Sequence, residues 1–242
     1  MIYFNPKYNV CVISISKNGS SSLEKWLLTC GFKKYDNFKK IGNDVVCYHV
    51  LRNPIKRFAS GLVEAFFTVN NDEFQQYTVN ESLMSLSQPA IEEFCLHFIT
   101  KLDFNRGYWP GFKNLDKKTN FWKDEPHMRA QCDYLSVVRQ ETNKLVPISF
   151  EYVPNFGHVL YKSIDIKNKT SLISEPIEHL NQSNSAKKYF AETLSNIIIK
   201  NWDMTLFDPF RNHLREDIKY WNDSIKTEFM NKYNKDEHIR LI

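Results

Sequence analysis

A short polar loop near the start of the chain carries residue types that bind anions. It runs from Ser16 to Ser22 and contains Lys17, Gly19 and three successive serines. The loop follows an apolar run, Val10–Ile15, and precedes a pattern typical of a helix. Free backbone N–H groups and the helix dipole attract negative charge at a helix N-terminus, and glycine lets a ligand approach the backbone closely. The pattern therefore predicts a loop that binds phosphate or sulfate.

The loop alone leaves a second interpretation open. Ser20, Ser21 and Ser22 could simply cap the helix, and a single lysine is often only solvated. The loop also differs from the Walker A pattern of ATPases and kinases, because Lys17 comes before Gly19 rather than after it. An ordinary nucleotide-hydrolysing P-loop is therefore disfavoured.

A second basic element follows a second apolar run. Arg52 comes directly after Val45–Leu51, and Pro54 then suits the first turn of a helix that carries Ser60. Ligands of open α/β sheets bind at the carboxyl ends of strands, and an arginine there can hold a phosphate with two parallel hydrogen bonds. We expect Ser60, two helical turns in, to face the same site. Taken singly, Arg52 could also be an ordinary surface arginine, and Ser60 could be an ordinary serine on a helix.

Together, the two elements resemble the sulfotransferase superfamily, whose enzymes use PAPS (3'-phosphoadenosine 5'-phosphosulfate). The 5'-phosphosulfate loop of that family looks like Lys17 to Leu23, and its 3'-phosphate element looks like Arg52 to Ser60, an R-x-P-x-x-R-x-x-S arrangement. Further segments resemble the carbohydrate, or Golgi-type, branch. They are Ile91–Phe94, Asp124–Gln131 (with Met128 and Ala130 in place of Trp and Pro), Phe150–Glu151, His179–Ser183 and Trp202–Phe207.

The resemblance implies a donor site. Lys17 would contact the phosphosulfate, and the loop from Asn18 through Gly19, Ser20 and Ser21 to Ser22 would cradle the 5'-phosphate. Arg52 and Ser60 would hold the 3'-phosphate, and Ser183 is a further candidate for cofactor binding. The acceptor would be a hydroxyl, on a carbohydrate, and the product PAP (adenosine 3',5'-bisphosphate). No metal is needed in this scheme.

The acceptor hydroxyl must lose a proton, so a general base is expected. His127 is the first candidate, because histidine titrates near neutrality and this one lies in a family-like segment. A structural histidine is the alternative. Glu64 is the second candidate, with a solvated helix glutamate as its alternative.

Two other functions stay open at this point. One is a P-loop-like kinase or nucleotide hydrolase, which would need a Walker lysine and a Mg²⁺-binding acid that the sequence does not clearly provide. The other is a non-catalytic module that binds PAP or an anionic glycan.

The strands and helices expected around these residues indicate an α/β fold. Two strand–loop–helix units in succession indicate a parallel β-sheet flanked by helices, as in the P-loop-like sulfotransferase fold. We expect further strands near Leu135–Arg139 and Val146–Phe150. Helices are expected from Pro89, over 155–163 and 186–201, and over about 212–233, where the pattern is amphipathic. The expectation is one domain over 1–242, with its core at about 10–210.

The composition agrees with a globular α/β protein. The chain has 242 residues and is 42% hydrophobic. Its formal net charge of +4 is too small for a protein that coats nucleic acid. Its 5 cysteines show no paired spacing, so we expect neither a disulfide framework nor a zinc site. No apolar run is long enough to span a membrane, and no secretory signal is visible. These features favour a soluble cytoplasmic enzyme of unknown oligomeric state, with a small-molecule donor and no nucleic-acid partner.

Overall fold

A computed structural model describes most of the chain and divides it into two compact units. The first unit comprises Met1–Arg52, Gln131–Leu180 and Glu216–Ile242, and the second comprises Asn53–Ala130 and Asn181–Arg215. Neither unit is one continuous segment, and a single domain over 1–242 stays a prediction. The described residues are 1–38, 41, 44–68, 87–100, 127, 129–141, 144–163, 177 and 185–226.

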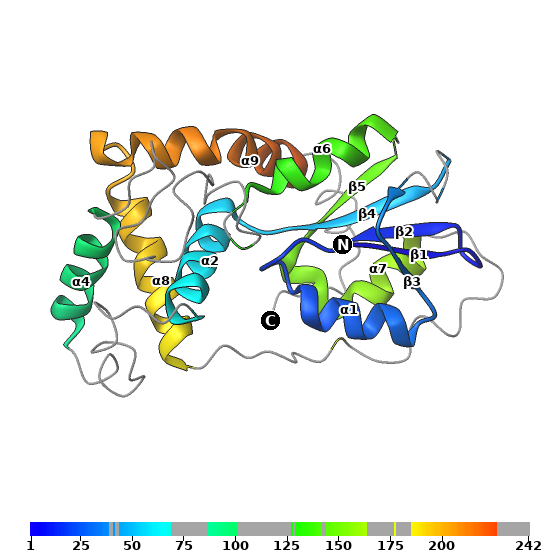
Figure 1. The fold of residues 1–242 in the computed structure, drawn as a ribbon, viewed down its shortest axis with the longest axis horizontal. Helices are drawn as coiled ribbons and strands as arrows, with labels where there is room; N and C mark the ends of the chain where they lie inside the picture. Colours follow the sequence, from blue (N-terminus) through cyan, green and yellow to red (C-terminus); the bar gives the residue numbers. More distant parts are fainter. Residues whose placement is uncertain are drawn as a thin grey trace. The chain divides into compact units, whose positions relative to one another are not determined.

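The first unit is built on a five-stranded sheet with the order β3-β1-β2-β4-β5 (Figure 1). β2, β4 and β5 are parallel neighbours, as predicted, so their carboxyl ends meet at one edge. The strands are β1 (Ile2–Asn5), β2 (Val10–Ile13), β3 (Lys33–Tyr35), β4 (Val46–Leu51) and β5 (Leu145–Ser149).

The expectation of a parallel sheet is wrong for its other half. β1 pairs antiparallel with both β2 and β3, so the sheet is mixed. The reason is the connection between β1 and β2, a turn over 6–9 in which Asn9 has a positive φ of 51°. A turn this short can only reverse the chain, whereas a parallel connection needs a dozen residues or more.

Helices cover both faces of this sheet. Side chains of α1 (Ser20–Thr29) and α7 (Phe156–Ser163) pack with Val12, Tyr48 and Val50 on one face. Side chains of α6 (Gln131–Glu141) and the later part of α9 (Asp208–Lys226) pack with Cys11, Ile13 and Cys47 on the other. Because both faces are buried, β2 is apolar throughout, and β4 is apolar except for the buried His49, rather than alternating between apolar and polar residues.

The strand predicted near Leu135–Arg139 is instead part of α6. Leu135 and Val138 are buried while Ser136 is exposed, which is the spacing of one helix face. The β-branched pair in this segment indicated a strand, but the helix buries its apolar residues against the sheet. The strand expected at Val146–Phe150 is confirmed as β5, and the 3-10 helix η3 (Phe150–Asn155) follows it.

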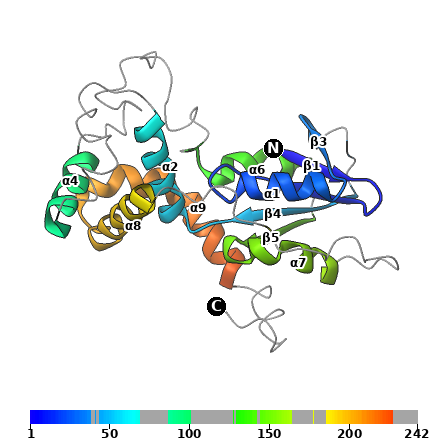
Figure 2. The ribbon, with the colours of Figure 1, turned by 90° about the horizontal axis from the view of Figure 1, so that it is seen from below.

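The second unit is helical. It contains α2 (Pro54–Thr68), α4 (Gln88–Thr100), α8 (Ser185–Lys200), the 3-10 helix η5 (Thr205–Phe207) and the first part of α9. α8 lies between α2 and α4 (Figure 2). The rings of Phe58 and Phe210 pack edge to face with their centroids 4.9 Å apart. The helices predicted from the sequence over these segments are confirmed, except that 227–233, the end of the helix predicted over about 212–233, lie outside the described residues.

None of the helices in the described ranges is both long enough and apolar enough to cross a membrane.

Candidate functional site

The loop between β2 and α1 has a strained backbone. Lys17 and Gly19 both have left-handed conformations, with φ angles of 66° and 71°. Glycine adopts this conformation freely, but a residue with a Cβ pays about 1–2 kcal/mol for it. Strain of this kind persists where the surroundings enforce it, and it concentrates at ligand sites. The conformation of Lys17 is therefore an independent sign that this loop has a role beyond connection.

The loop ends at the N-terminus of a helix, where Gly19 and Ser20 are half-buried and Ser21 is exposed. Gly19 is the N-cap of α1, and no side chain forms a hydrogen bond at that cap, so the alternative in which the serines only cap the helix is not supported. Ser20, Ser21 and Ser22 form the first turn, whose N–H groups have no carbonyl acceptors within the helix. The first turn contains no acidic residue. With Lys17 beside it, this end of α1 has the electrostatics of an anion site.

The side chain of Asn18 anchors the loop to neighbouring parts of the first unit. Its side chain is buried, and Nδ2 donates to the Val50 carbonyl at 2.6 Å and to Gln131 Oε1 at 2.7 Å. Its backbone N–H donates to the Ile15 carbonyl at 3.1 Å. These polar contacts hold the loop against the neighbouring strand, β4.

Arg52 lies beside the loop. It follows β4, and its Nη1 donates to the Lys17 carbonyl at 3.0 Å. The guanidinium stacks on the Phe150 ring, 4.8 Å from the centroid. A planar cation gains both electrostatic and dispersion energy over an aromatic face. Phe150 thus orients Arg52 next to the strained loop.

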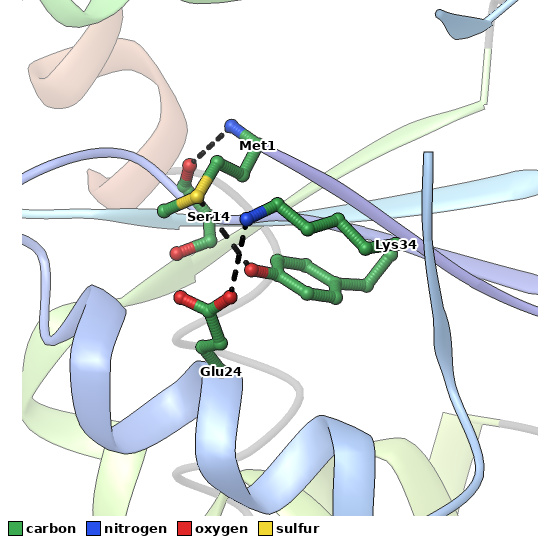
Figure 3. A network of polar contacts seen from close by, with 5 residues as sticks. Met1, Ser14, Glu24 and Lys34 are labelled. Carbon is green, nitrogen blue, oxygen red and sulfur yellow. Dashed lines mark hydrogen bonds and ion pairs between the residues drawn. The ribbon is translucent and has the colours of Figure 1, made fainter. Parts of the chain in front are cut away.

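The strand β1 secures the base of the loop (Figure 3). The Met1 ammonium donates to the Ser14 carbonyl, and the Ser14 N–H donates to the Met1 carbonyl, both at 2.9 Å. Burial, and then the nearby charge of Lys34, lowers the pKa of the Met1 ammonium. Close by, Lys34 Nζ lies 3.4 Å from Glu24 Oε1, which joins β3 to α1. These contacts continue the antiparallel pairing up to the point where the loop begins.

The candidates on α2 belong to the second unit. Ser60 is half-buried, and its predicted contact with a 3'-phosphate stays a prediction. Glu64 forms an ion pair with Lys187, whose Nζ lies 3.5 Å from Oε2. Arg57 is fully buried, and its Nη1 donates to the Arg129 carbonyl at 2.7 Å, so it is part of the packing of this unit.

The other two candidates are His127 and Ser183. His127 is half-buried in a turn of the second unit, and its role as a base stays a prediction. Ser183 lies outside the described residues.

Three residues at the site have roles that the sequence did not indicate. They are Phe150 under Arg52, Gln131 between the loop and β4, and Asp217 on α9, which accepts hydrogen bonds from the α6 backbone. Gln131 and Phe150 do fall within the family-like segments of the sequence. Asp217 carried no signal, because an acidic residue on an amphipathic helix is usually solvated.

Substitution of Gly19 tests whether the loop geometry is enforced. A Cβ at this position would lie 3.3 Å from Phe150 Cε2 and 3.4 Å from Val153 Cγ1. The positive φ adds strain, so Gly19→Ala should lower the free energy of unfolding by about 1–2 kcal/mol. Urea denaturation measures this directly. An unchanged midpoint would contradict the loop geometry described above, whereas Gly31→Ala, with φ 79° and no contact closer than 3.8 Å, provides the control for φ strain alone.

The chain matches no protein-family model, no curated protein and no solved structure in the three comparisons that we made. The likeness to sulfotransferases is therefore carried by the ordered motifs alone. Among the described residues, no group of three His, Cys, Asp or Glu side chains is arranged to hold a metal ion.

Proposed function

We propose that this chain is a PAPS-dependent sulfotransferase that transfers a sulfuryl group to an acceptor hydroxyl, on a carbohydrate. The observation that carries the proposal is the contact between its two basic elements, in which Arg52 Nη1 donates to the carbonyl of the strained Lys17. PAPS carries anionic groups at both the 5' and the 3' positions of one ribose. Two cationic elements side by side at the carboxyl ends of neighbouring parallel strands suit such a ligand.

The protein groups at this site have the chemistry that binding of PAPS requires. Lys17 supplies a charged ammonium, the first turn of α1 supplies backbone N–H groups, and Arg52 supplies a planar guanidinium. At an effective dielectric constant near 20, two unit charges about 4 Å apart attract by roughly 4 kcal/mol. In the proposed arrangement, the loop and Lys17 hold the 5'-phosphosulfate and Arg52 holds the 3'-phosphate.

The proposed reaction is an in-line displacement at sulfur. The acceptor oxygen forms a bond to sulfur while the bond from sulfur to the bridging oxygen breaks, and PAP leaves with that electron pair. Lys17 stabilises the negative charge that develops on the bridging oxygen. The acceptor proton passes to a base, for which the sequence proposes His127 first and Glu64 second. The protein's contribution is otherwise positioning, as in phosphoryl transfer.

Stabilisation by PAP tests the proposal without knowledge of the acceptor. A ligand that binds only the native state at 100 times its dissociation constant adds about 2.7 kcal/mol to stability. For a chain of this size we expect the melting temperature to rise by about 5–10 °C. Differential scanning fluorimetry with PAP, with 5'-AMP and with Mg²⁺–ATP measures it.

The pattern of shifts separates the candidate functions. A shift with PAP that exceeds the shift with 5'-AMP is the expected result. A shift with Mg²⁺–ATP alone would contradict the proposal and favour a kinase or nucleotide hydrolase. A shift with PAP, without transfer from PAPS to any acceptor in a broad oligosaccharide panel, would favour a binding module instead.

A further inference from the structure

The side chain of Gln131 occupies the space between the two basic elements. It is buried, with 1% of its surface exposed, and it makes three side-chain hydrogen bonds. Oε1 accepts from Asn18 Nδ2 at 2.7 Å and from the Arg52 N–H at 3.1 Å. Nε2 donates to the Arg52 carbonyl at 2.9 Å. The carboxamide thus pairs with both backbone polar groups of Arg52, as a residue of an adjacent strand would, and it also holds Asn18.

Gln131 is itself fixed in place by Asp217. The Asp217 carboxylate accepts from the Gln131 N–H and from the Cys132 N–H, both at 2.7 Å. These groups form the N-terminus of α6, where the helix dipole favours a negative charge. Asp217 is buried, with 1% of its surface exposed, so this charge-assisted contact is shielded from water.

From these contacts we propose that Gln131 is a positioning residue for the donor site, and that Asp217 holds it there. This inference rests on the proposed function, since it concerns the same site. Gln131 keeps the Lys17 loop and the Arg52 turn at a fixed separation through Asn18 on one side and the Arg52 backbone on the other. Both anionic groups of one nucleotide can be bound together only while that separation is maintained.

Substitution of Gln131 should therefore weaken the binding of PAP by more free energy than it removes from the stability of the fold. Gln131→Met keeps the length of the side chain but removes all three side-chain hydrogen bonds, so the loop and Arg52 are no longer joined through this residue. Displacement of a positioned group by about 1 Å can cost on the order of 100-fold. We therefore expect the dissociation constant for PAP, measured by calorimetry, to rise by about 10- to 100-fold.

Asn5→Leu provides the matched control. Asn5 is also a buried amide, and it donates to the Cys30 carbonyl and accepts from the Lys7 N–H. It pairs with Val10 at the amino end of β2, whereas the loop follows the carboxyl end of that strand. Asn5→Leu should lower the melting temperature as Gln131→Met does, with the affinity for PAP unchanged.

Hydrogen exchange in the free protein tests the positioning role separately from the function. Gln131→Met should increase amide exchange in peptides covering 16–22, because the loop opens locally more often, while Asn5→Leu should not. Wild-type exchange at this loop in a folded Gln131→Met variant would overturn the inference. If wild-type protein does not bind PAP, the proposed function fails, and the exchange result still decides the role of Gln131. If Gln131→Met does not fold, Gln131→Asn keeps the carboxamide but withdraws it by one methylene from Asn18 and from the Arg52 backbone, and the same exchange criterion applies.

Discussion

Replacement of Lys17 by glycine should abolish sulfuryl transfer and leave the stability of the fold close to that of the wild type. Lys17 has a φ of 66°, a conformation that costs a residue with a Cβ about 1–2 kcal/mol and glycine almost nothing. That relief offsets the extra backbone entropy of glycine in the unfolded chain, about 0.5–1 kcal/mol. The ammonium, by contrast, is lost completely. Loss of one donor aimed at developing charge typically lowers kcat by about 100- to 1,000-fold.

The measurement is the rate of PAP formation from PAPS in the presence of an oligosaccharide mixture, together with a urea denaturation curve. Lys25→Ala is the control, because it removes the same charge from an exposed position on α1. We expect that control to transfer at the wild-type rate. Substantial transfer by Lys17→Gly, or a loss equal to that in Lys25→Ala, would exclude Lys17 from the proposed role.

Replacement of Arg52 by alanine should remove the preference for a 3'-phosphate. The guanidinium stacks on Phe150 and can present parallel N–H groups to a phosphate, and a charge-assisted hydrogen bond contributes about 1.5–3 kcal/mol. That energy corresponds to a factor of about 10–150 in affinity. Wild-type protein should therefore bind PAP more tightly than 5'-AMP by about this factor, while Arg52→Ala binds both equally weakly.

Calorimetric titration with the two nucleotides gives this ratio for each variant. Arg52→Lys should behave almost as Arg52→Ala does, because an ammonium can neither stack on Phe150 in the same way nor form two parallel bonds. Arg215→Ala, which removes a cation from an exposed position on α9, should keep the wild-type ratio. A preserved preference for PAP in Arg52→Ala would assign the 3'-phosphate to another residue.

Much of the fold could be predicted because its core elements carry strong local patterns. β2 and β4 are short apolar runs, and each is followed by helix-start residues in the sequence. β1 was not predicted because Pro6 interrupts the apolar pattern ahead of Val10, although Ile2 pairs with Ile13 across the turn. The α6 segment was misassigned because Val137 and Val138 favour strands, whereas burial against the sheet selects a helix.

The charged residues of the candidate site could be predicted from the sequence, but the residues that hold them in place could not. Lys17 and Arg52 have informative types and follow apolar strands, so the topology of parallel neighbours brings them together. Asp217 meets Gln131 across a sequence separation of 86 residues, and that contact depends on how α9 packs. No local pattern encodes such a contact. The strain at Lys17 is likewise a property of the folded loop, because lysine gives no local preference for a positive φ.

A crystal structure of the wild-type protein with PAP at about 100 times its dissociation constant is the most direct test of the central claim. We expect the 5'-phosphate to lie against the N–H groups of 19–22 beside Lys17, and the Arg52 guanidinium to hold the 3'-phosphate. PAP bound elsewhere, or with its 3'-phosphate away from Arg52, would show that this loop and Arg52 are not the donor site.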